Sequence, residues 1–175
     1  MLMKQWIVLI LWMLSGIACG TAKRASRPGT TPPNRIEEPA RNKFKNRAAI
    51  VTYAKKYLGT PYVYGGADPG KGFDCSGFVQ YVFKHFNIIV PRTTKDYAAF
   101  GKRTSLKNAK VADLILFSLY DDYNTIGHIG IICAIEQDKV FFIHAASGKS
   151  SKKVMISELT GVHLKRMRFI TNVME

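Results

Sequence analysis

The sequence predicts an α+β domain in which helices come first and an antiparallel β-sheet follows. Two observations support this fold class. Apolar residues recur at helical spacing in the first half of the domain, and short apolar runs separated by turn residues fill the second half. The runs expected to form strands are residues 114–118, 128–135, 139–144, 153–156 and 165–170. A length of 175 residues suits one such domain with additional segments.

Residues 1–18 are typical of a signal peptide. Lys4 supplies a positive start, residues 6–14 form a continuous apolar run, and small residues follow. The run is shorter than the ~20 residues needed to cross a bilayer. The end of this segment, Gly16-Ile17-Ala18-Cys19, resembles a bacterial lipoprotein signal, in which the cysteine is acylated. An ordinary secretory signal is the alternative.

Residues 19–45 are expected to form a disordered basic tether that precedes a domain spanning residues 46–175. The tether contains several prolines and few apolar side chains, so burial cannot offset the chain entropy lost on folding. The whole chain carries a formal net charge of +14, which attracts polyanions such as anionic lipid or wall polymers. Because no nucleic-acid-binding motif is present, we expect no nucleic acid partner.

Three helices are expected in the first part of the domain. The first ends at the candidate C-cap Gly59 and places apolar residues on one face: Ile50, Val51, Ala54 and Leu58. The second begins near Cys75 with Asp74 as the candidate N-cap, and its apolar face comprises Phe78, Val82, Phe83 and Phe86. A third, shorter helix covers residues 94–100.

Cys75 is the candidate nucleophile. A nucleophilic cysteine must be exposed and partly ionised, and the N–H groups and dipole at a helix N-terminus favour the thiolate. Gly77 within the same helix costs ~1 kcal/mol relative to alanine, which indicates that another segment packs closely there. The alternative is that Cys75 is a buried small apolar residue. Cys133 lies mid-strand and is expected in the core, although an oxidising compartment would permit a bridge between the two cysteines.

Two of the four histidines are candidates for a catalytic base and its positioning partner. His128 opens an apolar strand and His144 lies near the end of the next one. His85 lies nearly three turns along the Cys75 helix and cannot reach the sulfur, and His163 falls in a late loop without a partner motif. We therefore expect His128 to take the proton from Cys75 and His144 to fix the tautomer of His128.

The register of the hairpin decides whether the two histidines can meet. With a two-residue turn at Gln137-Asp138, His144 would lie opposite Ile131, and the two histidines would face opposite sides of the sheet. With a three-residue turn, Glu136-Gln137-Asp138, they would be diagonal neighbours on one face, and Cys133 would face the other side. A Cys/His/His constellation therefore predicts the three-residue turn.

Six short motifs occur in an order that covers nearly the whole domain: Gly59-Thr60-Pro61-Tyr62-Val63-Tyr64-Gly65-Gly66, Phe73-Asp74-Cys75-Ser76-Gly77-Phe78, Pro91-Arg92-Thr93, Ala112-Asp113-Leu114, Gly127-His128-Ile129-Gly130-Ile131 and Phe142-Ile143-His144-Ala145. Together they resemble the NlpC-type family of cell-wall cysteine peptidases. The resemblance implies a papain-like fold, with the nucleophile helix packed on an antiparallel sheet that carries both histidines. It also implies a peptidoglycan hydrolase that cleaves stem peptides, typically between γ-D-Glu and diaminopimelate, through an acyl-enzyme.

The resemblance extends to substrate-binding residues. Tyr62 matches a tyrosine that lies beside the nucleophile and assists substrate or oxyanion binding. Asp74 and Ser76 match positions that hold the free amine of the stem peptide, although helix capping is their structural alternative. Arg92 is expected to line the cleft. The sequence departs from the family pattern at three positions: Tyr64 stands for the usual tryptophan, Ala112 for the usual glycine, and Lys71 is an insertion.

We expect neither a cofactor nor a metal ion, and a monomer that meets the membrane through a lipid on Cys19. The expected location is the cell envelope, at the outer membrane and facing the periplasm, with secretion as the alternative. Two other kinds of function remain open: a cell-wall amidase or thiol acyltransferase on a related fold, and a non-catalytic wall-binding lipoprotein.

Overall fold

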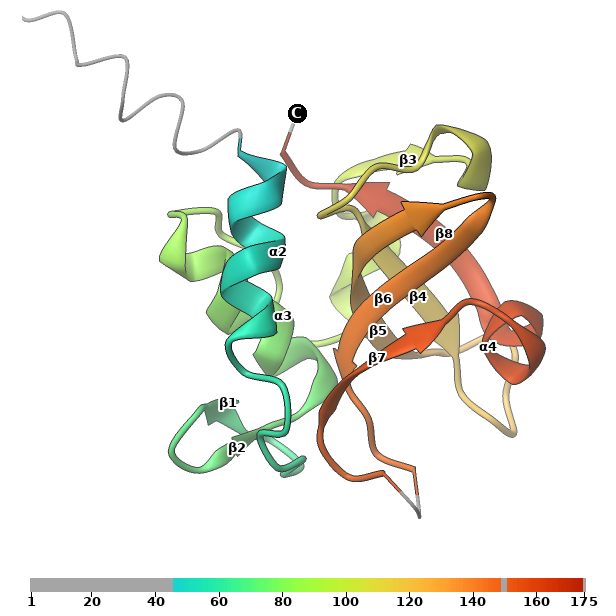
Figure 1. The fold of residues 1–175 in the computed structure, drawn as a ribbon. Coiled ribbons are helices and arrows are strands. Elements are labelled where there is room, and N and C mark those ends of the chain that lie inside the picture. Colours follow the sequence, from blue (N-terminus) through green and yellow to red (C-terminus); the bar gives the residue numbers. More distant parts are fainter. Residues whose placement is uncertain (1–45, 149–150, 175) are drawn as a thin grey trace, which may run out of the picture. The chain divides into compact units, whose positions relative to one another are not determined.

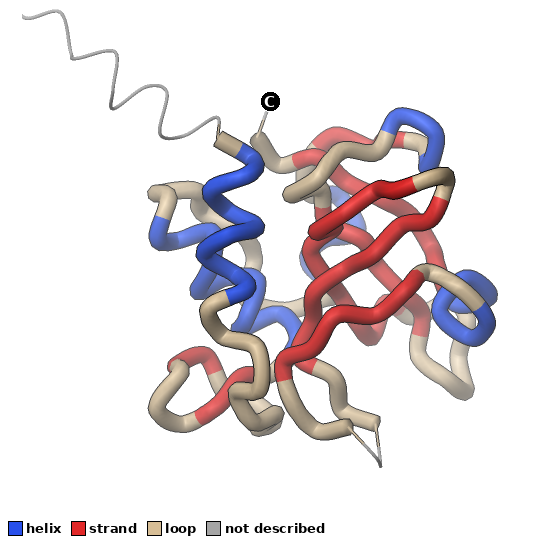
Figure 2. The backbone as a smooth tube through the Cα atoms, in the orientation of Figure 1, coloured by secondary structure: helices blue, strands red, loops and turns tan. Residues whose placement is uncertain are grey.

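The computed structural model describes residues 46–148 and 151–174. The expected signal peptide, Cys19 and the tether lie outside the described residues. In the described chain the two longer helices lie on one side of a twisted sheet, and a short helix near the C-terminus lies on its other side (Figure 1, Figure 2). This arrangement confirms the predicted α+β class. None of the helices in this part of the chain is long and apolar enough to cross a membrane.

Helix α2 spans Arg47–Lys55 and is capped by the side chain of Asn46, which accepts a hydrogen bond from the N–H of Ala49. It buries Ile50, Val51 and Ala54 as expected. The prediction that it continues to Gly59 is wrong, because its C-cap is Lys56, and Leu58 is 46% exposed. The N–H of Gly59 instead donates to the carbonyl of Val154, so the chain leaves the helix to meet the sheet.

Helix α3 spans Cys75–His85, with Asp74 as its N-cap. The Asp74 side chain accepts a hydrogen bond from the N–H of Gly77 at 2.6 Å, and Phe78, Val82 and Phe83 are buried. A Cβ at Gly77 would lie 2.1 Å from the carbonyl oxygen of Gly66. The glycine is therefore required because the preceding loop crosses the first turn of the helix, as the sequence predicted.

The sheet has six strands in the order β3-β8-β4-β5-β6-β7, and every neighbouring pair is antiparallel. Its strands are β3 Lys102–Thr104, β4 Leu114–Ser118, β5 Ile126–Glu136, β6 Lys139–Ala145, β7 Val154–Glu158 and β8 Met167–Asn172. The remaining short elements are β1 Ala67–Asp68, β2 Gly72–Phe73, the 3₁₀ helices η1 Lys95–Ala99 and η2 Leu106–Asn108, and helix α4 Gly161–Arg166. Strands β4 to β7 form the expected meander, and β8 returns beside β4. Strand β8 begins two residues later than the predicted strand 165–170, because helix α4 continues to Arg166. The helix predicted for residues 94–100 is the 3₁₀ helix η1.

The β5–β6 hairpin has a two-residue turn, so the predicted three-residue turn is wrong. Glu136 pairs with Lys139, and Gln137 and Asp138 take left-handed backbone angles, with φ of 46° and 67°. The register is nevertheless the one that the histidines need, because it shifts between Ile132 and Ala134. Cys133 is the additional residue of this β-bulge. Ile131 therefore pairs with Ile143, which brings His144 opposite Gly130.

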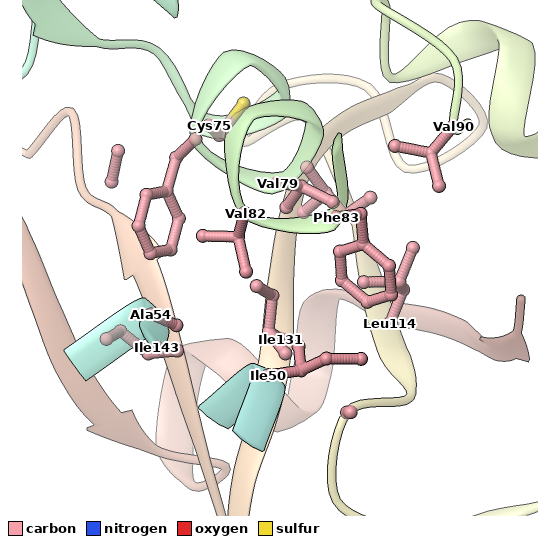
Figure 3. Close-up of a cluster of buried hydrophobic side chains, with 14 of the residues drawn as sticks. Ile50, Ala54, Cys75, Val79, Val82, Phe83, Val90, Leu114, Ile131 and Ile143 are labelled. Atoms are coloured by element: carbon pink, nitrogen blue, oxygen red, sulfur yellow. The ribbon is translucent and has the colours of Figure 1, made fainter. Parts of the chain in front are cut away.

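The two faces of the sheet carry separate apolar clusters. The cluster beneath α2 and α3 includes Ile50, Val79, Val82, Ile131 and Ile143 (Figure 3). The opposite face carries a second cluster formed by Ile115, Phe117, Ile132, Val140, Phe142, Leu159 and Ile170. Cys133 belongs to the first cluster and is 6% exposed, as predicted. Both Cys75 and Cys133 are free thiols, so the bridge between them is not formed.

Candidate active site

Cys75 is the first residue of α3 and lies at the edge of the apolar cluster in Figure 3, where it is 8% exposed. The backbone N–H groups of Ser76 and Ile129 lie close enough to the sulfur to lower the pKa of the thiol. Ile129 directly follows His128 on β5, so the helix N-terminus meets the sheet beside the candidate base. Cys75 makes no hydrogen bond to His128 or His144 in this structure, an arrangement that can tighten when substrate binds.

Burial dominates the ionisation of Cys75. It raises the pKa of the thiol to about 11, and the nearby Asp74 carboxylate raises it further, against the smaller opposing effect of the backbone N–H groups. The expectation of a partly ionised thiol is therefore wrong for the resting protein. The thiol is neutral at pH 7, and it needs a base to take its proton when it reacts.

Asp74, Ser76 and Arg92 form one connected polar group at the N-terminus of α3. Arg92 donates from Nη1 to Oδ1 of Asp74 at 3.0 Å and from Nη2 to Oδ2 at 2.7 Å. It also donates to Oγ of Ser76 and to the carbonyl of Gly65. The hydrogen bond to Asp74 is the main cause that raises the pKa of Arg92. Both carboxylate oxygens of Asp74 are thus already occupied by protein donors.

Tyr62 lies close to this polar group and to the thiol. A bridge between Tyr62 and Phe73 places it beside the start of α3. Burial raises the pKa of its phenol, and the proximity of Cys75 and Asp74 raises it further. The structure therefore brings four of the predicted site residues together around the thiol: Tyr62, Asp74, Ser76 and Arg92.

His128 and His144 are in direct contact on the sheet face that carries Phe117. Nε2 of His128 lies 2.7 Å from Nδ1 of His144, and Nε2 of His144 lies 2.9 Å from Oγ of Ser157. Gly130 leaves room for this pair, because a Cβ there would lie 3.3 Å from the Cβ of His144 and 2.7 Å from the Phe142 ring. The contact leaves Nδ1 of His128 without a partner among the described residues. Nδ1 can accept a proton in the tautomer in which Nε2 of His128 donates to His144.

Burial keeps both histidines neutral. It lowers the pKa of His128 well below its usual value, and the nearby His144, Arg166 and His163 lower it further. Burial and the proximity of His163 lower the pKa of His144 to about 3. A neutral imidazole is the form that a general base requires. At neutral pH the resting site thus combines a neutral thiol with neutral imidazoles.

Three residues of this region were not predicted from the sequence: Ser157, His163 and Arg166. His163 was expected in a loop, but it lies on α4, and its ring centroid is 5.9 Å from that of His144. Ser157 reaches His144 because β7 pairs with β6 in the observed register. Neither position depends on a local motif, since both are set by how the chain after β6 folds back. Among the described residues, no group of three or more His, Cys, Asp and Glu could hold a metal ion.

Comparison with known proteins identifies the class to which this fold and site belong. Residues 59–172 match the NlpC/P60 family, which is more than half of the chain. The chain is therefore a member of the NlpC/P60 family, as the motifs suggested.

Individual relatives agree with this membership. The chain is 42% identical over 113 residues to the gamma-DL-glutamyl hydrolase of Bacillus subtilis, a match that covers 63% of this chain and 25% of that protein. It is 40% identical over 101 residues to a probable endopeptidase of Haemophilus influenzae, covering 57% of this chain and 59% of that protein. The solved structure of the NlpC/p60 domain of the peptidoglycan hydrolase SagA superposes with a TM-score of 0.58 and 32% identity, covering 73% of this chain and 98% of that one.

Proposed function

We propose that this protein is a peptidoglycan hydrolase, a cysteine endopeptidase that cleaves stem peptides through an acyl-enzyme on Cys75. The observation that carries the proposal is the contact of His128 Nε2 with His144 Nδ1, which leaves Nδ1 of His128 for the role of base. His128 lies on β5, next to Ile129, whose N–H meets the thiol. The names of the relatives support the substrate, because they include a peptidoglycan hydrolase and a probable endopeptidase.

In the proposed reaction, the Cys75 sulfur attacks the scissile carbonyl as its proton moves to Nδ1 of His128. The resulting imidazolium then protonates the leaving amine, and the acyl group stays on the sulfur as a thioester. Water, deprotonated by His128, attacks the thioester and releases the acid and the thiol. Tyr62 and the backbone N–H at the start of α3 would stabilise the oxyanion, and such donors are worth ~3–4 kcal/mol each in other acyl-transfer enzymes.

The acyl side of the substrate would lie over Tyr62, Asp74, Ser76 and Arg92. An acidic side chain beside the nucleophile suits a stem peptide with a free amino terminus. Because Arg92 already pairs with Asp74, an incoming ammonium group would share or displace that contact. We propose that the scissile bond joins the γ-carboxyl of D-Glu to diaminopimelate. The gamma-DL-glutamyl hydrolase among the relatives supports a γ-glutamyl bond.

The deciding experiment is to incubate the purified, reduced protein with L-Ala-γ-D-Glu-diaminopimelate and to identify the products by mass spectrometry. The Cys75→Ala variant is the matched control. Cleavage after D-Glu that is lost in the variant would establish both the bond and the nucleophile. If a folded, reduced protein cleaves neither this peptide nor whole peptidoglycan, the endopeptidase assignment fails.

Other products would favour the alternatives. Release of a stem peptide from the sugar chain would indicate an amidase, and transfer of the acyl group to an added amine would indicate an acyltransferase. Wall binding that survives Cys75→Ala, without any product from the unmodified protein, would indicate a non-catalytic wall-binding protein.

We also propose that Cys19 carries a lipid that holds the enzyme at the outer membrane, facing the periplasm. Only the sequence pattern before Cys19 supports this location. Growth of expressing cells with an alkyne-labelled fatty acid should label the protein and not the Cys19→Ala variant. An unlabelled protein in the culture medium would indicate secretion instead.

A further inference from the structure

A cavity of about 260 Å³ adjoins the two histidines, and its lining includes Tyr120, His128, His144, Ser157, His163 and Arg166. Neither Cys75 nor the polar group around Asp74 lines it. The cavity is therefore separate from the proposed binding site for the acyl part of the substrate. Its volume is roughly that of nine water molecules in the liquid, enough for a small polar group.

Arg166 is the unusual residue of this cavity. It is 4% exposed, and its Nε and Nη2 atoms both donate to the carbonyl of Ser118, at 3.1 Å for Nε. Its guanidinium also lies 3.6 Å over the ring of Tyr120. Within residues 46–148 and 151–174, no carboxylate contacts Arg166, and no Asp or Glu lines the cavity. A buried positive charge without a counter-ion is costly unless something compensates it.

The comparison with the two other buried or half-buried arginines of the domain is informative. Arg47 contacts Asp113 at 2.6 Å, and Arg92 contacts Asp74 at 2.7 Å. Each of these arginines thus has an acidic partner, whereas Arg166 contacts only a neutral carbonyl and an aromatic ring. An anionic ligand in the cavity would supply the missing partner.

The cavity also faces the catalytic histidines. The positive charge of Arg166 lowers the pKa of His128 and of His163. Arg166 is therefore close enough to act electrostatically on His128, the proposed base. In the proposed reaction, His128 protonates the leaving amine, so the amino acid that carries this amine must lie beside His128. That amino acid, if it is diaminopimelate, carries two carboxyl groups.

We propose that this cavity is the leaving-group subsite, in which Arg166 and His163 bind a carboxylate of the diamino acid that is released. The assignment rests on the proposed function. It implies that the enzyme distinguishes substrates by the charge on the leaving side of the scissile bond. Diaminopimelate has one carboxylate more than lysine, so the subsite provides a physical basis for preferring it.

The test uses the Cys75→Ala protein, which can bind substrate without turning it over. Calorimetry would compare L-Ala-γ-D-Glu-diaminopimelate with two analogues, each amidated at one carboxyl of the diaminopimelate. We expect at least one amide to bind tenfold or more weakly than the parent peptide. Arg166→Gln should weaken binding of the parent by the same factor and leave that amide unchanged, and Arg166→Lys should retain part of the preference.

Two results would overturn the subsite: equal binding of all three peptides, or an equal loss for all three in Arg166→Gln. Because Arg166 also holds the carbonyl of Ser118, Arg166→Gln could fail to fold. The comparison of acid and amide on the protein with Arg166 intact does not depend on that variant and still decides the question.

A titration with meso-diaminopimelate alone separates this proposal from the proposed function. NMR would follow the ring protons of His163, with those of His85 as the reference. If no peptide is bound or cleaved but the His163 signal shifts saturably and the His85 signal does not, the cavity binds the carboxylate of the diamino acid, but the endopeptidase assignment fails and with it the role of leaving-group subsite. If the peptide is cleaved equally well whichever carboxyl of its diaminopimelate is amidated, the endopeptidase function stands and the proposed subsite is wrong. Absence of both peptide and diaminopimelate binding removes both.

Discussion

The 2.7 Å contact between Nε2 of His128 and Nδ1 of His144 continues to Ser157, whose Oγ lies 2.9 Å from Nε2 of His144. The contacts are consistent with one set of tautomers. If Nδ1 of His128 is to accept the proton from Cys75, Nε2 of His128 must donate to His144, and Nε2 of His144 must donate to Ser157. The hydroxyl of Ser157 can accept that hydrogen bond, so in this set of tautomers all three side chains are satisfied and His144 holds the tautomer of His128.

Replacing His144 should slow the chemical step. We expect His144→Ala to lower kcat by about 10²–10⁴-fold with little change in KM, because His128 loses the acceptor that fixes its tautomer. His144→Gln, whose amide oxygen can accept a hydrogen bond, should lose less. Steady-state kinetics on the stem peptide measures both.

Ser157→Ala should cost about tenfold or less in kcat, because only the outer contact of the relay is removed. A loss from Ser157→Ala as large as that from His144→Ala, or a change in KM alone, would contradict this order of roles. Thermal unfolding of each variant controls for misfolding.

The neutral state of the Cys75 thiol predicts a steep pH dependence of alkylation. With a pKa of about 11, only about one thiol in 10⁴ is ionised at pH 7, so the iodoacetamide rate should rise about tenfold per pH unit from pH 7 to 10. Mass spectrometry of the Cys75 peptide distinguishes it from Cys133, and a small thiol of ordinary pKa in the same buffer is the reference. A fast, pH-independent rate between pH 5 and 8 would instead indicate a preformed thiolate–imidazolium pair.

The buried histidines predict that the fold weakens in acid. Above pH 6.5 His144 is neutral in both folded and unfolded chains and contributes no pH dependence. Below that pH His144 binds a proton in the unfolded chain, whereas in the folded protein it stays neutral until the pH approaches about 3. The free energy of unfolding should therefore fall by about 1.4 kcal/mol per pH unit for this residue alone.

Urea unfolding at several pH values between 7 and 4 measures this slope. His144→Gln should make the slope shallower, because it removes the group that takes up a proton only on unfolding. Equal slopes for the unmodified protein and His144→Gln would contradict the assignment.

The two roles of Asp74 can be separated by substitution. Asp74→Asn keeps the side-chain oxygen that accepts from the N–H of Gly77 but removes the charge that pairs with Arg92. We expect it to fold and to raise KM at least tenfold for a peptide with a free amino terminus. The N-acetylated peptide should be unaffected, because it presents no ammonium group.

Asp74→Ala removes the helix cap as well, so it should lose about 1–2 kcal/mol of additional stability. Equal effects of Asp74→Asn on the free and the acetylated peptide would show that the carboxylate serves the helix and Arg92 rather than the substrate.

Local sequence rules were sufficient for the helix that carries Cys75. The Asp74 cap, the Gly77 close approach and the apolar face of α3 all depend on spacing within a few residues, and all are found. The end of α2 was misplaced, because a long-range hydrogen bond from Gly59 to Val154 decides where the chain turns.

The meeting of His128 and His144 was predicted for the wrong reason. For His128 and His144 to lie on the same face of the sheet, the hairpin needs one residue more than a two-residue turn with regular pairing provides. The sequence does not reveal whether the turn or the strand supplies that residue. A β-bulge at Cys133 supplies it, with no glycine or proline to indicate its position. The surroundings of Arg166 could not be predicted either, since they depend on where α4 packs after the last turn of the sheet.

The observed turn leads to a prediction about stability. Gln137 and Asp138 both have positive φ and are exposed, a conformation that costs about 1–2 kcal/mol for residues other than glycine, less for Asp and Asn. Asn-Gly is the pair that suits a two-residue hairpin turn. The double variant Gln137→Asn/Asp138→Gly should therefore raise the free energy of unfolding by about 1 kcal/mol, after allowing for the greater freedom of glycine in the unfolded chain. Activity should not change, because the turn is at the other end of the hairpin from His128.

Asp138→Ala, which keeps the Cβ and loses the polar side chain, should give no gain. A double variant no more stable than the unmodified protein in urea would mean that the turn does not hold this strain, and that the register depends on the bulge at Cys133 alone.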